Sequence, residues 1–310
     1  MKVSFVATVR DAGPHIETFL SSVTSQTRPP DEIVIVDGGS IDGTLEILRK
    51  TEGVTLIEEP GANIARGRNV AIGAATHDVI AVSDADCELV PDWLERVLVP
   101  IEKGADVAMG LYRARATGFF QACAAAVAVP EPEEVDEGTF MPSSRSVAFR
   151  KDAYVAAGGY PEWLDRGEDM YLDHRWREIG VRMELAPRAV AFWPPRATLA
   201  EHWRQYFGYA KGDALAQMYP ERHAIRFAVY ASAAAAVRKR RRAILALGTM
   251  AGGMYAARPI RRAWRMLDDP RSRAAALFAV PAMMAFTDAA KMAGYVAGLS
   301  ERFRVEGPQD

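Results

Sequence analysis

Two carboxylates in the first third of the chain have a spacing and a position that suit metal chemistry. Asp84 and Asp86 flank Ala85 and directly follow the apolar run at residues 79–82, which has the composition of a buried strand. Carboxylates spaced in this way can share a divalent cation, and such a cation neutralises the charge of a nucleoside diphosphate. Aspartates at a strand end are also common as solvated turn residues, so this motif needs support from the rest of the chain.

Further polar residues end the first two predicted strands. Thr8 and Arg10 close the first, and the second stops at Asp37 before a run of small residues that leads into a helix. Such a turn lets the chain approach a nucleotide closely, and Asp37 could accept hydrogen bonds from its base or ribose. The alternative is a plain turn between a strand and a helix. A Walker loop is excluded because no Gly-Lys-Ser/Thr follows.

The segment at residues 61–69 joins a Gly-marked loop to a helix that carries Arg66 and Arg68. Arginines two positions apart on a helix point in different directions, so we expect at most one to reach a diphosphate. We favour Arg66, and the alternative is a solvated helix face.

A late predicted helix begins with two acidic residues, Glu168 and Asp169. A general base must lie within hydrogen-bond reach of the hydroxyl that it deprotonates, and a second carboxylate beside it can raise its pKa toward the working pH. The alternative is that both acids are present only because the helix dipole favours negative charge at this end.

Taken in order, these segments resemble the motifs of the family 2 glycosyltransferases, which have a GT-A fold. The resemblance covers about residues 1–210, and it is carried by residues 8–10, 36–44, 65–69, 84–86 and 167–169. It implies that Thr8, Arg10 and Asp37 hold the nucleoside, and that Asp84 and Asp86 bind Mn²⁺ or Mg²⁺ together with the donor. It also implies that Asp169 is the catalytic base, with Glu168 beside it to orient the acceptor.

His202 is a further candidate, because some family members place a third metal ligand, a histidine, just after the last strand. The match is loose, and a residue on a helix face is an equal alternative. Processive polymer synthases of the family carry Gln-X-X-Arg-Trp near this point. The present chain has His-Trp-Arg-Gln at residues 202–205, which favours the transfer of one or a few sugars.

The elements that must position these residues alternate between short apolar runs and segments of helical period, which indicates an α/β fold. We predict a doubly wound, mixed but mostly parallel sheet with flanking helices, whose ligand crevice lies beyond the carboxyl ends of the strands. Strands are expected at residues 3–9, 32–37, 54–58, 79–83, 106–113, 146–150 and 190–193. Helices are expected at residues 15–25, 43–51, 64–75, 91–102, 151–157 and 167–179. The acidic, Pro-containing residues 129–142 are expected to form a loop over the site.

Charge divides the chain more sharply than its net value of −2 suggests. Residues 1–221 contain 22 basic and 34 acidic side chains, a net of −12, whereas residues 222–304 contain 16 basic and 4 acidic ones, a net of +12. Such asymmetry usually means that one part meets an anionic partner. We therefore predict a catalytic domain at residues 1–220 and a basic, Ala-rich helical region at residues 221–310.

The C-terminal region pairs apolar helices with arginine clusters, a combination that is attracted to anionic cytoplasmic lipid. Residues 243–257 are fewer than the roughly 20 needed to cross a bilayer, and residues 274–299 are interrupted by Pro281, Asp288 and Lys291. We expect these helices to lie in the membrane interface. A soluble appendage or a homo-oligomer contact is the alternative, and nucleic acid is not expected because no base-reading motif is present.

The combined expectation is an inverting enzyme at the cytoplasmic face of the membrane. It would move a sugar from a nucleoside-diphosphate sugar, UDP in preference to GDP, to a hydroxyl of a lipid-linked or polysaccharide acceptor. The start of the chain lacks a signal peptide, and two cysteines fit a reducing cytoplasm. One alternative is a sugar nucleotidyltransferase, although residues 8–14 lack its Gly-rich loop. The other is a non-catalytic nucleotide-sugar-binding scaffold.

Overall fold

The computed structural model describes residues 1–305, which form two compact units. Unit 1 consists of Met1–Arg115 and Glu131–Pro194, and unit 2 of Ala116–Pro130 and the residues from Pro195 onward. This division differs from the boundary expected at residue 220. The helices at residues 118–128 and 199–215 pack with the C-terminal helices and so belong to unit 2.

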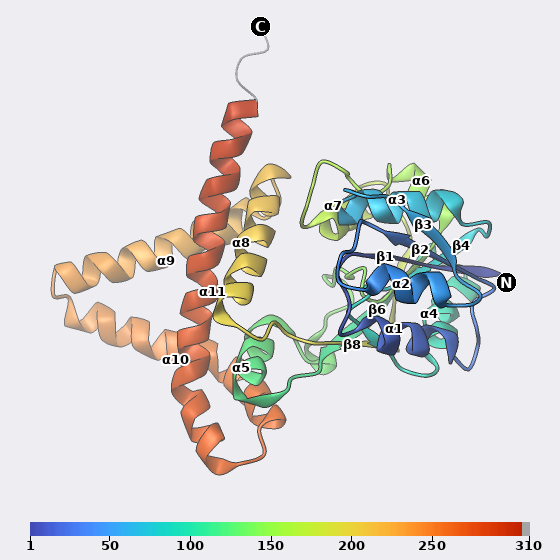
Figure 1. Ribbon diagram of the computed structural model, residues 1–310. Helices are drawn as coiled ribbons and strands as arrows, with labels where there is room; N and C mark the ends of the chain where they lie inside the picture. Colours follow the sequence, from blue (N-terminus) through green and yellow to red (C-terminus); the bar gives the residue numbers. More distant parts are fainter. Residues whose placement is uncertain (306–310) are drawn as a thin grey trace, which may run out of the picture. The chain divides into compact units, whose positions relative to one another are not determined.

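Unit 1 is built on one eight-stranded sheet with the spatial order β3-β2-β1-β4-β7-β6-β8-β5 (Figure 1). The strands are β1 Val3–Val9, β2 Glu32–Asp37, β3 Thr55–Glu58, β4 Val79–Val82, β5 Glu88–Leu89, β6 Val107–Ala114, β7 Val147–Arg150 and β8 Met183–Trp193. The first four strands are parallel, while β7 runs antiparallel to both of its neighbours and β5 antiparallel to β8. The predicted mixed, mostly parallel sheet is confirmed.

Helices cover both faces of this sheet (Figure 1). One side carries α1 Ile16–Thr24, α2 Thr44–Lys50 and α4 Trp93–Glu102, and the other carries α3 Ile64–Ala74, α6 Lys151–Ala156 and α7 Glu168–Glu178. Successive residues of a strand point to opposite faces. Accordingly, Phe5 of β1 packs against Phe19 and Trp93, with ring centroids 6.0 Å apart in both cases. Its neighbour Val6 joins the cluster that contains Trp176 of α7.

Strand register brings the candidate site residues to one edge. Val9 at the end of β1 lies beside Asp37 at the end of β2, and Val6 pairs with Val82, the last residue of β4. The carboxyl ends of these parallel strands therefore meet where the ligand crevice was predicted. On the other side of β4, antiparallel β7 begins at Val147, directly opposite Val82.

Three elements differ from the sequence prediction, and one of them is the two-residue strand β5, which was not predicted. Strand β8 begins at Met183 rather than at residue 190, because its first half carries Glu184 and Arg188 and is only partly buried, so no apolar run marks it. Helix α5, Gly118–Ala128, was not predicted at all. Within the acidic segment expected to form a loop, Pro132–Glu134 makes one short 3-10 turn.

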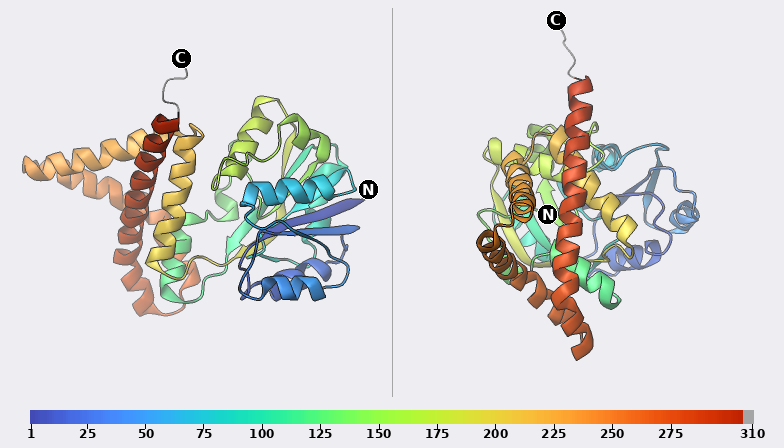
Figure 2. Two further views of the ribbon diagram at one scale, coloured as in Figure 1. Left: turned by 45° about the horizontal axis from the view of Figure 1, so that its top comes forward. Right: turned by 90° about the vertical axis from the view of Figure 1, so that its left-hand side faces the viewer.

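Unit 2 is entirely helical in its described residues. It contains α5, α8 Leu199–Leu215, α9 Pro220–Arg238, α10 Arg242–Met266 and α11 Pro270–Val305, and α9 and α10 form a hairpin (Figure 2). Glycines allow α11 to lie directly on α8. A Cβ at Gly294 would stand 2.8 Å from the carbonyl carbon of Phe207, and one at Gly298 would stand 2.7 Å from the Cβ of Ala214.

One helical segment among the described residues, Pro270–Arg302, is long and apolar enough to cross a membrane by length and composition. Core helices of soluble proteins can meet the same criterion. Here the same helix also supplies Ala276 and Val280 to a buried cluster that includes Cys123 of α5.

The sheet is tightly packed around Gly110 of β6. A Cβ at this position of β6 would stand 2.8 Å from the carbonyl oxygen of Ser146 and 2.9 Å from that of Ala189. Because these are backbone atoms, Gly110→Ala should lower the free energy of unfolding by about 1–3 kcal/mol in urea titrations. Gly73→Ala is the control, since nothing lies within 4 Å of its new Cβ. That helical substitution should raise stability by about 0.5–1 kcal/mol, and equal stability of the two variants would contradict the packing argument.

Candidate active site

The two aspartates that follow β4 differ in their surroundings. Asp84 forms ion pairs with Arg68, through Nη2, and with Arg145, whose Nε lies 3.7 Å from Oδ2. Burial alone would raise the pKa of Asp84, but these two guanidinium groups outweigh it and hold the pKa below its ordinary value. Asp86 is half-buried, and its Oδ2 accepts a hydrogen bond from the indole nitrogen of Trp193 at 3.2 Å. The lowered pKa favours the ionised form of Asp84.

Arg68 connects the acidic turn after β4 with the start of α7. Its side chain is 2% exposed, and Nη1 donates to Glu168 Oε1 at 2.5 Å while Nη2 donates to Asp84. The guanidinium carbon also lies 5.1 Å from the centre of the Tyr160 ring. The structure thus brings together two acidic motifs that are more than 80 residues apart in the sequence.

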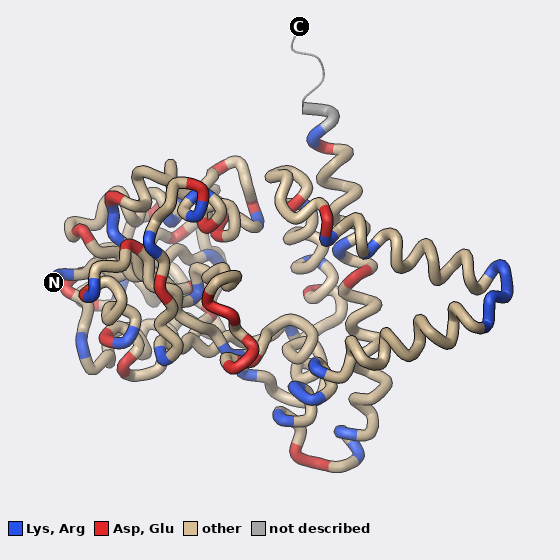
Figure 3. The backbone as a smooth tube through the Cα atoms, turned by 180° about the vertical axis from the view of Figure 1, so that it is seen from behind, with Lys and Arg blue, Asp and Glu red and all other residues tan. Residues whose placement is uncertain are grey.

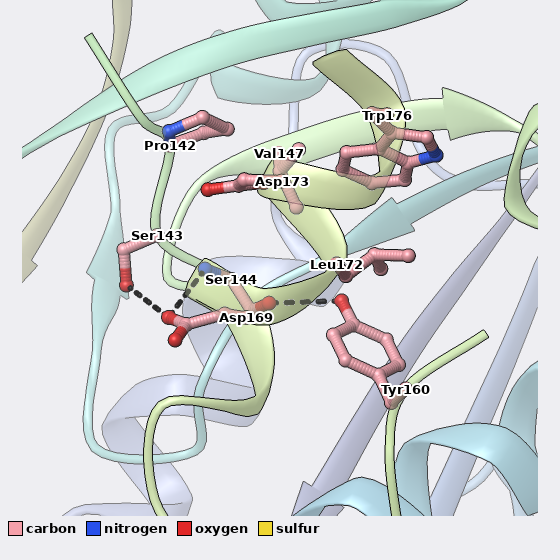
Figure 4. Close-up of a pocket in the computed structure, with 9 residues that line it drawn as sticks. All are labelled: Pro142, Ser143, Ser144, Val147, Tyr160, Asp169, Leu172, Asp173 and Trp176. Carbon is pink, nitrogen blue, oxygen red and sulfur yellow. Dashed lines mark hydrogen bonds between the residues drawn. The ribbon is translucent and has the colours of Figure 1, made fainter. Parts of the chain in front are cut away.

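Glu168 and Asp169 occupy the first turn of α7, which begins after Gly167 at a φ of 84°. Burial, reinforced by the charge of Asp169, raises the pKa of Glu168, and Arg68 opposes this change. Asp169 is less buried, and its Oδ2 lies 3.3 Å from Ser143 Oγ and 3.5 Å from the backbone nitrogen of Ser144 (Figure 4). The carboxyl group of Glu168 is hydrogen-bonded to Arg68. The carboxyl group of Asp169 makes only long contacts with Ser143 and Ser144, which a hydroxyl group of a ligand can replace.

A narrow pocket lies beside Asp169 (Figure 4). It is lined by Pro142, Ser143, Ser144, Val147, Tyr160, Asp169, Leu172, Asp173 and Trp176. Asp173 follows Asp169 by one helical turn, is 2% exposed, and its Oδ2 has no hydrogen-bond partner among the described residues. Burial and then the charge of Asp169 raise the pKa of Asp173 well above its ordinary value, with Arg177 opposing them. Burial thus favours the neutral form of this carboxyl in the folded protein.

The residues predicted to hold the nucleoside lie at the ends of β1 and β2. Asp37 is 1% exposed, and its carboxylate accepts hydrogen bonds from the backbone of Gly39 and from the backbone and hydroxyl of Ser40. Thr8 lies under Gly67 of α3, where an added Cβ would stand 2.9 Å from the Cβ of Thr8. The side chain of Arg10 is 61% exposed. Asp37 thus shapes its own turn, and the assigned contacts with a nucleoside stay predictions.

The two arginines of α3 lie in different surroundings: Arg66, which we favoured for the diphosphate, is on the surface, and Arg68 is buried. Arg66 is half-exposed and pairs with Glu59 at 2.6 Å and with Glu162 at 3.9 Å on the surface. Arg68 is the arginine that reaches the acidic site, because it shares the buried face of α3 with Ala65 and Ile72. That apolar pattern was the signal in the sequence that could have identified it.

His202 is accounted for within unit 2. Its Nε2 lies 2.8 Å from Thr287 Oγ1 of α11, and its ring packs on Tyr206 with centroids 4.5 Å apart. Burial, together with the charge of Lys291, lowers the pKa of His202 to about 4. These contacts are those of a neutral histidine that packs between helices. They give no support to the predicted role of His202 as a metal ligand.

Residues 1–305 contain no group of three or more His, Cys, Asp or Glu side chains arranged to hold a metal ion. Mg²⁺ is usually bound through one or two carboxylates together with substrate phosphates, rather than in a cage made by protein alone. The half-buried carboxyl groups of Asp84 and Asp86 fit that kind of site.

The neutral state of Asp173 can be measured through stability. A raised pKa means that the folded state binds the proton of Asp173 more tightly than the unfolded state does. The stability that this proton contributes is fully present at pH values below about 4, and it is lost as the pH rises through the pKa of the folded protein. Asp173→Asn cannot ionise and should therefore become increasingly more stable than the unaltered protein between pH 4 and pH 8. Thermal or urea unfolding across this range checks it. Glu52→Gln, at an exposed position, should show no such trend, and a parallel pH dependence of both variants would contradict the assignment.

Comparison with known proteins agrees with this site. Residues 4–122 match the model of a family described as "Glycosyl transferase family 2". The chain is 30% identical over 216 residues to the succinoglycan biosynthesis protein ExoA of Rhizobium meliloti, an alignment that covers 64% of this chain and 65% of that protein. It is 29% identical over 230 residues to the glycosyltransferase AglE of Haloferax volcanii, covering 68% of this chain and 72% of that one. The chain thus spans about two thirds of the length of these relatives.

Two solved structures share the fold. A mannosyltransferase from Pyrobaculum calidifontis, in complex with GDP-Man and Mn²⁺, superposes with a TM-score of 0.52 at 20% identity, covering 99% of this chain and 76% of that one. GalNAc-T7 with UDP, GalNAc and Mn²⁺ gives a TM-score of 0.51 at 15% identity, covering 69% and 47%. At these identities the likeness concerns the fold alone. In its ordered motifs, its family match over residues 4–122 and its GT-A-like sheet, the chain is similar to the proteins of glycosyltransferase family 2.

Proposed function

We propose that this protein is a metal-dependent, inverting glycosyltransferase that uses a nucleoside-diphosphate sugar. The acceptor is a hydroxyl group of a lipid-linked or polysaccharide glycan. The observation that carries the proposal is the pairing of Arg68 with both Asp84 and Glu168, which fixes the metal-binding turn next to the helix that begins with the base. A donor held at Asp84 and Asp86 would therefore have its sugar near Asp169.

Asp169 is the proposed general base. Its carboxyl group lies in the first turn of α7, beside the pocket. In a single displacement, the acceptor hydroxyl gives its proton to Asp169 while its oxygen forms a bond to the anomeric carbon. The bond from that carbon to the diphosphate oxygen breaks on the opposite side, and the nucleoside diphosphate leaves with the electron pair. Inversion at the anomeric carbon follows from this geometry.

Asp84 and Asp86 are the residues that would hold Mn²⁺ or Mg²⁺. When bound, the ion neutralises charge that develops on the departing diphosphate. Glu168 has a different task in this scheme, because its side chain is buried against Arg68. It anchors the first turn of α7 through its hydrogen bond with Arg68.

UDP is the donor nucleotide that we favour, with GDP as the alternative. The mannosyltransferase of the same fold was solved with GDP-Man, and GalNAc-T7 with UDP, so the fold accommodates both. A thermal-shift series with UDP- and GDP-sugars in the presence of Mn²⁺ distinguishes them.

We also propose that the basic C-terminal region, residues 221–310, associates with the cytoplasmic face of a membrane. Support comes from the hairpin of α9 and α10, whose turn is a run of basic residues, coloured blue in Figure 3. The arms of the hairpin expose large apolar side chains, including Val229, Leu247, Met250, Met254 and Tyr255. Apolar surface next to clustered arginines is attracted to anionic lipid.

The catalytic assignment predicts the effect of two single substitutions. Asp169→Asn removes the proton acceptor and Asp86→Ala removes a metal ligand, so each should reduce transfer by at least about 100-fold. Release of nucleoside diphosphate in the presence of acceptor and Mn²⁺ is the measurement. Asp165→Asn, at an exposed position just before α7, is the matched control and should retain activity. Near-normal turnover by either site variant, with its thermal stability unchanged, would remove that residue from the mechanism.

Membrane association can be tested by fractionation. The full-length protein should sediment with membranes and require detergent for release. Leu247→Glu combined with Met250→Glu places charge on the exposed arm of α10 and should shift the protein toward the supernatant. Val155→Glu combined with Ile179→Glu makes the same changes at exposed apolar positions of unit 1 and should not. An unaltered protein found in the high-speed supernatant without detergent would refute the proposal.

A further inference from the structure

Arg145 is placed at the site by the register of the sheet. Val147 of β7 pairs with Val82 of β4 in antiparallel orientation, so the residues before β7 lie beside those after β4. The backbone confirms this placement, because Ser83 Oγ donates to the carbonyl oxygen of Arg145 at 2.8 Å. Arg145 therefore faces the acidic turn at Asp84, although about 60 residues separate them in sequence.

The guanidinium group of Arg145 packs against two neighbouring aromatic rings. Its carbon is 5.2 Å from the ring centre of Tyr112 on β6 and 5.0 Å from that of Trp193 on β8. Trp193 also donates to Asp86 through its indole nitrogen. Such contacts with aromatic rings hold the planar group in place without using its N–H donors. The side chain is 14% exposed, so it is shielded and still accessible from the site.

The ion pair of Arg145 is looser than that of the other arginine on Asp84. Arg68 donates directly to Asp84 and is fully enclosed between two carboxylates. Arg145 approaches the same carboxylate only to 3.7 Å, beyond hydrogen-bond distance. An anion that offers direct, charge-assisted hydrogen bonds can therefore take over this guanidinium at small cost, while Asp84 keeps Arg68.

Arg145 is also linked to the proposed base. Its Nη1 donates to Ser143 Oγ at 2.9 Å, and that oxygen lies 3.3 Å from Asp169 Oδ2. Arg145 thus contacts Asp84 of the proposed metal-binding turn, and it is connected to the proposed base, Asp169, through the hydroxyl of Ser143. The leaving group of the proposed reaction must depart from the region between them.

We propose that Arg145 binds the terminal phosphate of the nucleoside diphosphate, the phosphate that carries the sugar, and stabilises the charge that develops there. This inference rests on the proposed function, since it requires a diphosphate donor. An arginine fork matches phosphate oxygens in two parallel hydrogen bonds, and fixed donors at a developing charge lower the barrier. The alternative role is a structural one, in which Arg145 only neutralises Asp84.

Comparing diphosphates with monophosphates separates the two roles. Dissociation constants of UDP, UMP, GDP and GMP are measured by calorimetry, with and without Mn²⁺, for the unaltered protein and for Arg145→Gln. If Arg145 contacts the terminal phosphate, the variant should bind the preferred diphosphate about 10- to 100-fold more weakly and the matching monophosphate almost unchanged. This selective loss should persist without Mn²⁺.

Arg115→Gln is the matched control. Arg115 also lies over an aromatic ring, that of Phe192 at 4.6 Å, and pairs with Glu88, but half of its side chain is exposed. Its nucleotide affinities should equal those of the unaltered protein. If Arg145→Gln does not fold, Arg145→Lys takes its place: a point charge without the fork should bind the diphosphate more weakly than arginine does and leave the monophosphate unaffected.

The possible outcomes test different claims. Equal weakening of monophosphate and diphosphate, or no weakening of either, would overturn the role of Arg145 and leave the proposed function intact. Failure of the unaltered protein to bind any of the four nucleotides would overturn the proposed function, and this inference with it.

Discussion

A guanidinium group almost sealed from water joins the two acidic parts of the site. Arg68 lies between Asp84, which follows β4, and Glu168, which starts α7. Transferring three charged groups out of water is costly, and only their mutual pairing and hydrogen bonds offset this cost. Loss of any one member would leave a buried charge without its counterpart. The distance between the acidic turn after β4 and the start of α7 is consequently set by the span of one side chain.

Much of the site could be predicted because strand ends and helix starts are local properties. The carboxylates at residues 84, 86, 168 and 169 stand directly beside an apolar run or at a helix N-terminus, and the edge rule for parallel strands brings them together. Arg68 was missed because the two arginines of α3 were compared by spacing alone. Its position on the apolar face of the helix, in phase with Ala65 and Ile72, was the better indicator. Arg145 left no local signal, since Tyr112 and Trp193 reach it from distant strands.

The errors in the fold have a related cause. The first half of β8 contains exposed Pro187 and Arg188 and no continuous apolar run, and its pairing with β6 rather than its own composition makes it a strand. Helix α5 buries Ala122 and Cys123 against α10 and α11, more than 130 residues later in the chain. The boundary between the units depends on such distant packing. Composition and net charge, which report on neighbours in sequence, could not reveal it.

Helix α3 rests on β1 at a point where no side chain fits. A Cβ at Gly67 would stand 2.9 Å from the Cβ of Thr8, so the helix axis can come this close to the sheet only because that atom is missing. Arg68 is the next residue along the helix, and how deeply its side chain is buried depends on the distance between the helix and the sheet. A larger residue at 67 would lift the helix and withdraw the guanidinium from its two carboxylates. The alignment of the site thus depends on a residue that has no side chain of its own.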